Sequence, residues 1–286
     1  MAFIRLNKTI TIIDRCIGGF GLAVLLIFAG FSLFPAAIAP YHPKTMFDPW
    51  QKPSAEHPLG TNDMGYDISS ELIYAAGSTL GVGIAAAIIT LAAGTGMGIL
   101  AGYLGGWKGE LVGTTINIFL LIPMLPAAIV VAAYLGALWP NMILTIAVLG
   151  WCPTARIVRA RTVQLKQTPF IESLLILAIP RRRILFGHIL PNLSEIILAR
   201  CILSVSNCMM MEASLSFIGL GDPSHVTWGG MVNLAYRNGG FSRGAVNWFL
   251  APSLCIMLCV LGFYCINHFI EKRSAVVDGG NNSYMD

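Results

Sequence analysis

The chain has 286 residues, of which 56% are apolar and only 11% charged, and its mean hydropathy is +0.71. A soluble domain of this length carries charge on about a quarter of its residues. The composition therefore excludes an ordinary soluble protein and predicts an all-α, polytopic membrane helical bundle. The net charge of +4 is spread along the chain and does not indicate a nucleic-acid partner.

Hydropathy predicts six transmembrane helices, each near the roughly 20 apolar residues that a span requires. The first is longer than the 7–15-residue apolar core of a signal peptide, so we interpret it as a retained anchor. In chain order the predicted spans are Cys16–Ile38, Leu80–Tyr103, Gly113–Leu135, Met142–Val158, Glu195–Phe217 and Phe249–Ile270.

The distribution of basic residues predicts the orientation. With the N-terminus inside, 14 of the 18 Lys and Arg residues lie in inner segments, as the positive-inside rule requires. We therefore expect both termini to be cytoplasmic. Residues 1–15 form an N-terminal segment, 16–270 the six-span domain and 271–286 a tail, in a protein of the bacterial inner membrane.

Two connections are long enough to carry function. The predicted outer loop, residues 39–79, is rich in proline and then acidic. The predicted inner loop, residues 159–192, is basic and contains an apolar pattern of helical spacing between Pro169 and Pro180. That helix is too short to span a membrane. It is either an interfacial helix that holds basic residues against anionic lipid or a docking element for a partner.

Residues of the inner loop resemble the signature loop of importer permeases of the ATP-binding-cassette family. That signature reads Glu-Ala-Ala, then Gly four residues after its second position, then Ile-x-Leu-Pro. Here the spacing is kept, with substitutions at Ser173, Leu174 and Ala178, and with His188 at the first Ile position and Pro191 at the end.

Three further stretches are similar to the dipeptide, oligopeptide and nickel branch of that family. The first runs from His57 to Thr61, with Gly65 and Asp67, although Tyr66 stands where the branch usually has Arg. The second runs from Ala213 to Gly221, and the third is Trp228-Gly229 after Pro223. Together the matches cover residues 55–270.

The resemblance implies a mechanism and a set of partners. Two permease subunits would form the path, two cytosolic ATPases would drive it, and an external binding protein would deliver substrate, with the acidic outer loop as a docking surface. The loop carrying Glu172 would couple the permease to an ATPase. The candidate coupling residues are Glu172, Ser173, Leu174, Ala178, Arg181, Arg182, Arg183, His188 and Pro191.

Two features of this loop have alternative interpretations. The three arginines either pair with acids on the ATPase or form a solvated cluster that the positive-inside rule alone would place there. Alanine at position 178, where the family has glycine, predicts that the helix continues to Ile179 before Pro180 ends it.

The chain contains no G-x-x-x-x-G-K-[ST] loop, so ATP and Mg²⁺ are expected on the partner subunits and no cofactor on this chain.

The candidate substrate path is marked by Glu212, Pro123 and Pro126. An acid inside a span is a functional hypothesis by default, but it is equally well explained by a hydrogen bond to a neighbouring helix. The two prolines predict a kink in the third span. Gly94, Gly98, Gly102 and Gly106 recur every four residues, which favours close helix packing.

The seven cysteines show no metal or disulfide spacing, and we predict no metal site. An intramembrane enzyme would need paired catalytic groups within the spans, which the sequence does not offer, and a structural anchor would not need the signature loop. We therefore expect an importer permease rather than an enzyme. Its cargo is predicted to be short peptides, with nickel or a nickel chelate as the alternative.

Overall fold

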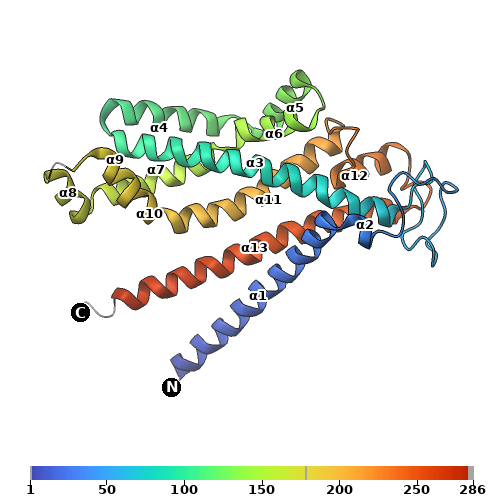
Figure 1. The fold of residues 1–286 in the computed structure, drawn as a ribbon, viewed down its shortest axis with the longest axis horizontal. Helices are drawn as coiled ribbons and strands as arrows, with labels where there is room; N and C mark the ends of the chain where they lie inside the picture. The colour runs from blue at the N-terminus through green and yellow to red at the C-terminus, as the bar shows by residue number, and fades with distance from the viewer. Residues whose placement is uncertain (1, 178, 283–286) are drawn as a thin grey trace.

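The computed structural model describes residues 2–177 and 179–282, and side chains within residues 12–273 apart from Leu175, Ala178 and Arg181. Figure 1 shows an elongated bundle of helices. Their bounds are α1 Ala2–Leu33, α2 Pro35–Ile38, α3 Ile68–Leu104, α4 Gly106–Leu121, α5 Met124–Leu135, α6 Trp139–Gly150, α7 Cys152–Lys166, α8 Pro169–Ile176, α9 Arg181–Ile184, the π-helix η1 Leu185–Ile189, α10 Leu190–Asn192, α11 Ser194–Ile218, α12 Trp228–Arg237 and α13 Val246–Asn282.

Five stretches of helix within the described residues are long and apolar enough to cross a membrane, and a sixth is a broken pair. The five are Ile12–Leu33, Ile68–Leu104, Trp139–Lys166, Ser194–Ile218 and Val246–Arg273. The pair consists of α4 and α5, which meet at an angle of 88°. The prediction of a polytopic helical membrane protein is confirmed, and the predicted third span, Gly113–Leu135, falls on this bent pair.

The break between α4 and α5 lies at the predicted proline kink. Helix α4 ends at Leu121, and Pro123 with extended backbone angles precedes α5. A proline lacks a backbone N–H and disfavours helical angles in the residue before it. Pro126 falls in the first turn of α5, where its missing N–H costs nothing.

Both predicted loops include helical residues. Residues 68–79 form the start of α3, which Asp67 caps by accepting a hydrogen bond of 2.8 Å from the backbone N–H of Ser70. Residues 159–166 belong to α7, which runs to Lys166. The connections proper are residues 39–67, called here the histidine loop, and residues 167–193, called here the α8 loop.

Helix α3 lies at the centre and packs tightly on α7 (Figure 1). A Cβ added to Gly94, Gly98 or Gly102 would lie within 2.6–2.7 Å of backbone or side-chain atoms of α7 or of Trp151 just before it. These glycines therefore permit the close approach that their spacing predicts. Gly106 does not, since nothing lies within 4 Å of it.

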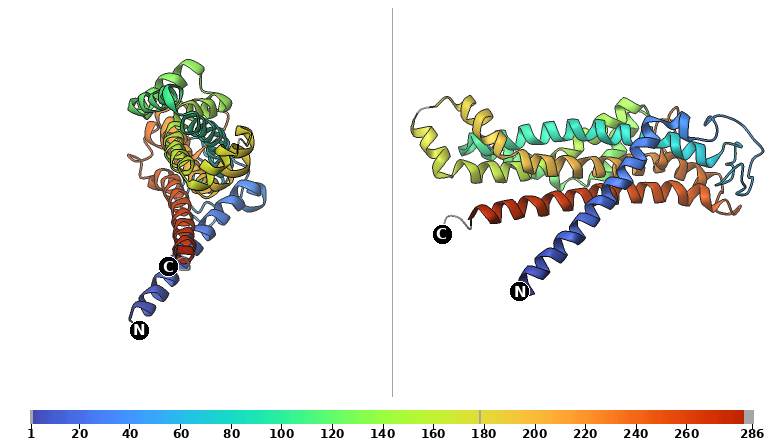
Figure 2. Two further views of the ribbon diagram at one scale, coloured as in Figure 1. Left: turned by 90° about the vertical axis from the view of Figure 1, so that its left-hand side faces the viewer. Right: turned by 60° about the horizontal axis from the view of Figure 1, so that its bottom comes forward.

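The two connections lie at opposite ends of the bundle. Figure 1 places α8, α9 and α10 at one end and the histidine loop at the other. In both Figures 1 and 2 the two termini lie toward the α8 end. The long helices thus connect two differently built ends.

Candidate functional site

The α8 loop begins as the expected helix between two prolines. Helix α8 starts at Pro169, and Glu172 lies in its first turn, where an acid is favoured by the helix dipole. The hydroxyl of Ser173 donates a 2.8 Å hydrogen bond to the carbonyl oxygen of Pro169. The helix ends at Ile176, so the predicted continuation to Ile179 is wrong. Ala178 lies outside the described residues.

One face of the α8 loop is held by an apolar cluster. Ile171 is 2% exposed, and it packs with Ile99 of α3 and Val158 of α7, and with Ile184, Ile189 and Leu193 from the rest of the loop. Leu174 is partly buried against the same cluster. The ends of two long helices and the loop therefore form one packed unit.

The other face of α8 is apolar and exposed. Phe170 is 56% exposed, Ile176 84% and Leu177 70%. Glu172 and Ser173 are exposed between them. Of the candidate coupling residues on α8, Glu172 and Ser173 thus face outward, while Leu174 faces the cluster.

The remaining candidate coupling residues lie in the second half of the loop. The side chains of Arg182 and Arg183 are exposed, and position 181 begins α9. The ring of His188 makes an edge contact with Phe170, with 5.4 Å between ring centroids. Pro191 is exposed in α10. The π-helix η1, which contains His188, thereby joins the second half of the signature to α8.

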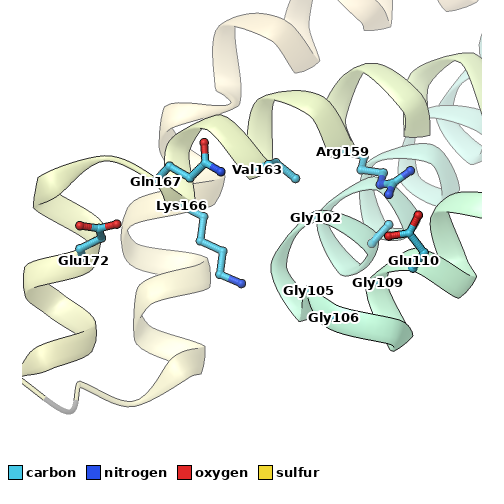
Figure 3. Close-up of a pocket in the computed structure, with 11 residues that line it drawn as sticks. Gly102, Gly105, Gly106, Gly109, Glu110, Arg159, Val163, Lys166, Gln167 and Glu172 are labelled. Carbon is cyan, nitrogen blue, oxygen red and sulfur yellow. The ribbon is translucent and has the colours of Figure 1, made fainter.

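A pocket of about 350 Å³ opens beside α8 (Figure 3). The turn between α3 and α4 forms one wall, and α7 and the start of α8 form the other. Its charged lining residues are Glu110, Arg159, Lys166 and Glu172. The ammonium group of Lys166 donates a 3.0 Å hydrogen bond to the carbonyl oxygen of Tyr103, which ties α7 to the end of α3.

A second cavity, of about 330 Å³, opens at the surface of the bundle against α11. Met124 and Leu125, at the start of α5, contribute to its lining. The predicted path residues Pro123 and Pro126 flank these two and are exposed. The break between α4 and α5 therefore places the start of α5 at the cavity.

Glu212 does not reach this cavity. Its side chain is completely buried, and the hydroxyl of Ser216 donates a 2.7 Å hydrogen bond to its Oε1. The backbone carbonyl of the neighbouring Ala213 would lie 2.5 Å from a Cβ at Gly229 of α12. Glu212 thus lies inside the bundle near the contact between α11 and α12, bonded to Ser216 of its own helix, and its Oε2 has no hydrogen-bond partner among the described residues.

The histidine loop is a closed structure built around the His57–Thr61 motif. The Nδ1 of His57 and the Oδ1 of Asp67 lie 2.9 Å apart, and both side chains are almost completely buried. The side-chain amide of Asn62 donates a 2.9 Å hydrogen bond to Glu71. Gly65 has a φ of 81°, and a Cβ there would overlap the carbonyl of Phe47. The buried residues of the motif thus hold the fold of the loop itself.

Comparison with known proteins identifies the family. Residues 94–276 match the family model of the binding-protein-dependent transport system inner membrane component. The chain belongs to this family. It is accordingly a multi-pass inner-membrane permease of an ATP-binding-cassette importer, a transport component and not an enzyme, as the resemblance implied.

The relatives of this permease belong to the peptide branch. It is 35% identical over 217 residues to the dipeptide transport system permease protein of Alkalihalophilus pseudofirmus, covering 76% of this chain and 70% of the relative. It is 33% identical to the glutathione transport system permease protein of Pectobacterium atrosepticum, covering 85% and 81%. The oligopeptide transport system permease protein of Mycobacterium bovis is 28% identical, with 74% and 72% covered.

The permease contains two polar features that our sequence analysis missed. Arg200 falls inside the predicted span Glu195–Phe217 but is not among the candidate site residues, although it lies in α11 and lines the 330 Å³ cavity. The rarity of charge inside a span was the signal that could have identified it. The second feature is Asp222, which lies in the sequence Asp222-Pro223-Ser224-His225, and no sequence pattern indicates its partner.

Asp222 links two distant parts of the permease. Its Oδ2 accepts a 3.0 Å hydrogen bond from the backbone N–H of Trp139, the first residue of α6. Ser224 donates a hydrogen bond to its Oδ1, and the ring of His225 lies 3.2 Å from its Oδ2 and stacks on Trp139. Partial burial alone would raise the pKa of Asp222, but these hydrogen bonds outweigh it and lower that pKa to about 2.

Proposed function

We propose that this chain forms half of the translocation path of an ATP-driven importer of short peptides. A second permease subunit forms the other half, two cytosolic ATPases bind ATP and Mg²⁺, and an external binding protein delivers the cargo. The relatives support peptides as cargo, since their names specify dipeptides, glutathione and oligopeptides.

The α8 loop is the coupling element of this proposal. The observation that carries it is the two-sided character of α8: Ile171 is buried in a cluster with the ends of α3 and α7, while Phe170 and Ile176 are exposed. An exposed apolar patch on a short helix is a surface for a protein partner. The buried face transmits the partner's movement as a rigid-body displacement of the long helices.

The charges beside α8 fit the same partner. Glu172 lies at the rim of the 350 Å³ pocket, next to an exposed apolar patch. Arg182 and Arg183 add exposed positive charge on the following helix. The ATPase would bind Phe170 and Ile176 in a groove. A basic side chain of the ATPase would pair with Glu172, and its acidic side chains would pair with the arginines. These charge pairs would fix the position of α8 in the groove.

The coupling role is tested with Glu172→Lys in the assembled importer. The substitution would place a positive charge opposite the proposed cation of the ATPase. Because the two charges would repel, we expect peptide uptake to fall at least tenfold while the variant stays in the membrane. Arg273→Gln changes an exposed charge at the end of the apolar stretch Val246–Arg273 of α13; it is the control and should transport normally. Unchanged uptake by Glu172→Lys would contradict the role of this residue.

The cargo is tested by uptake in cells that lack this gene. Loss of labelled di- or oligopeptide uptake with normal nickel accumulation supports peptide transport. A nickel defect that excess metal rescues, with peptide uptake intact, would instead assign the permease to nickel or a nickel chelate.

A further inference from the structure

One face of α11 carries polar residues through the membrane domain. Arg200, Ser204, Asn207, Met211 and Ser214 follow one another at alternating steps of four and three residues, which places them on one side of a helix. All five line the 330 Å³ cavity. Four of them are polar, and a polar stripe of this length is stable in a membrane only where it faces protein or water.

Arg200 is the charged member of this stripe. It lies six residues after the start of α11, about 9 Å along the helix at 1.5 Å per residue. Its Nε is buried and has no hydrogen-bond partner among the described residues. No acid of the described part of the chain lies within 4 Å of it, although Glu195 and Glu271 line the adjoining cavity of about 320 Å³.

A half-buried guanidinium whose Nε has no partner is costly, and a carboxylate that approaches it in a medium of low dielectric stabilises it strongly. Its planar fork forms two parallel hydrogen bonds to one carboxylate. The side chain is therefore suited to an anionic ligand that enters the cavity from outside this chain.

We propose that Arg200 binds the C-terminal carboxylate of a peptide in transit. This inference rests on the proposed function, because every linear peptide has such a carboxylate whatever its sequence. The neutral groups of Ser204, Asn207 and Ser214 can form hydrogen bonds with the amides of the peptide backbone. Such bonds do not depend on which side chains the peptide carries. From Arg200 to Ser214 the stripe is about 21 Å long, which matches about six extended residues.

The test uses the purified importer with its binding protein in liposomes and a labelled tripeptide. We expect Arg200→Gln to lower peptide uptake at least tenfold, and Arg200→Lys, which keeps the charge but loses the fork, to lower it less. Basal ATP hydrolysis and retention of the second permease should be unchanged. The matched control, Arg273→Gln, should transport like the wild type.

A photocrosslinking amino acid gives a second readout. Placed at Asn207 on the stripe, it should capture the labelled tripeptide during turnover, and Arg200→Gln in the same protein should lower capture at least fivefold. Placed at Met257, an exposed apolar position of α13, it should capture none.

Several results would overturn the proposal. Arg200→Gln with wild-type uptake would show that the carboxylate binds elsewhere. Loss of the second permease from the purified complex would assign Arg200 to a subunit contact. A deficit confined to liposomes with anionic lipid would assign it to a lipid headgroup. If the wild-type importer itself takes up no peptide, the proposed function has failed instead.

Discussion

The two ends of this permease are stabilised by different means. In the histidine loop, buried polar groups bond to one another: Asp67 contacts His57 and caps α3, and Asn62 bonds to Glu71. In the α8 loop, an apolar cluster around Ile171 holds one face, and large apolar side chains such as Ile176 are exposed on the other.

The difference separates a self-contained end from an end that is incomplete by itself. A network whose members satisfy one another needs no partner and fixes a single conformation. Exposed apolar residues on a helix of eight residues mark a surface that a second protein or the membrane surface covers. Sequence motifs mark both ends, and the second is the one that we propose as the docking surface for the ATPase.

The sharpest test of this comparison is whether the two ends lie on opposite sides of the membrane. A reporter fused after Asp48 should be active only if it functions outside the cell, and one fused after Lys166 only if it functions in the cytosol. The excess of basic residues on one side is the physical reason. The reverse activity at either position would refute the topology, with both termini cytoplasmic, that we predict.

The docking face and the packed face of α8 should respond differently to mutation. Ile176→Lys places a charge in the proposed interface, so we expect uptake to fall at least tenfold with the melting temperature of the permease unchanged. Leu174→Ala removes partly buried packing instead and should lower the melting temperature. Phe241→Lys, at an exposed apolar position near the opposite end, is the control. Equal uptake by Ile176→Lys and this control would contradict the docking role.

The polar network of the histidine loop should be essential for stability. Asp67→Ala leaves His57 and the two donors of Ser70 without their acceptor, which costs about 3–5 kcal/mol for a buried pair. Thermal unfolding in detergent measures this loss. Glu56→Ala removes an exposed acid of the same loop and should leave the melting temperature unchanged. Similar melting temperatures of both variants would show that the polar network contributes little to the stability of the permease.

The smallest effect is expected at Asp222. Asp222→Ala removes the acceptor for the first N–H of α6, which costs about 1 kcal/mol. Because folding lowers the pKa of this carboxyl to about 2, its contribution is complete above the unfolded value of about 4 and is lost as the pH falls through 2. The difference in stability between wild type and variant should therefore be constant from pH 8 to 5. A difference that changes in this range would show that a group other than the Asp222 carboxyl determines it.

The sequence by itself determined the class of the protein and its family. Long apolar segments require helices in a membrane, because backbone groups there must be satisfied within the segment. Pro123 predicted a kink because proline removes a donor and restricts its neighbour. The spacing from Glu172 to Pro191 was sufficient to predict the family.

Only the tertiary structure decided which side of each helix is packed inside the bundle and which is exposed. Periodicity did not show that Leu174 is packed inward while Ile176 is exposed, or that Glu212 is buried beside α12 and absent from the cavity. Asp222 caps a helix that begins 83 residues before it in the chain, and Arg200 meets the start of α5 only across a cavity. Such contacts depend on how helices distant in sequence pack together, and helix packing is set by side-chain shape over the whole bundle rather than by any local pattern.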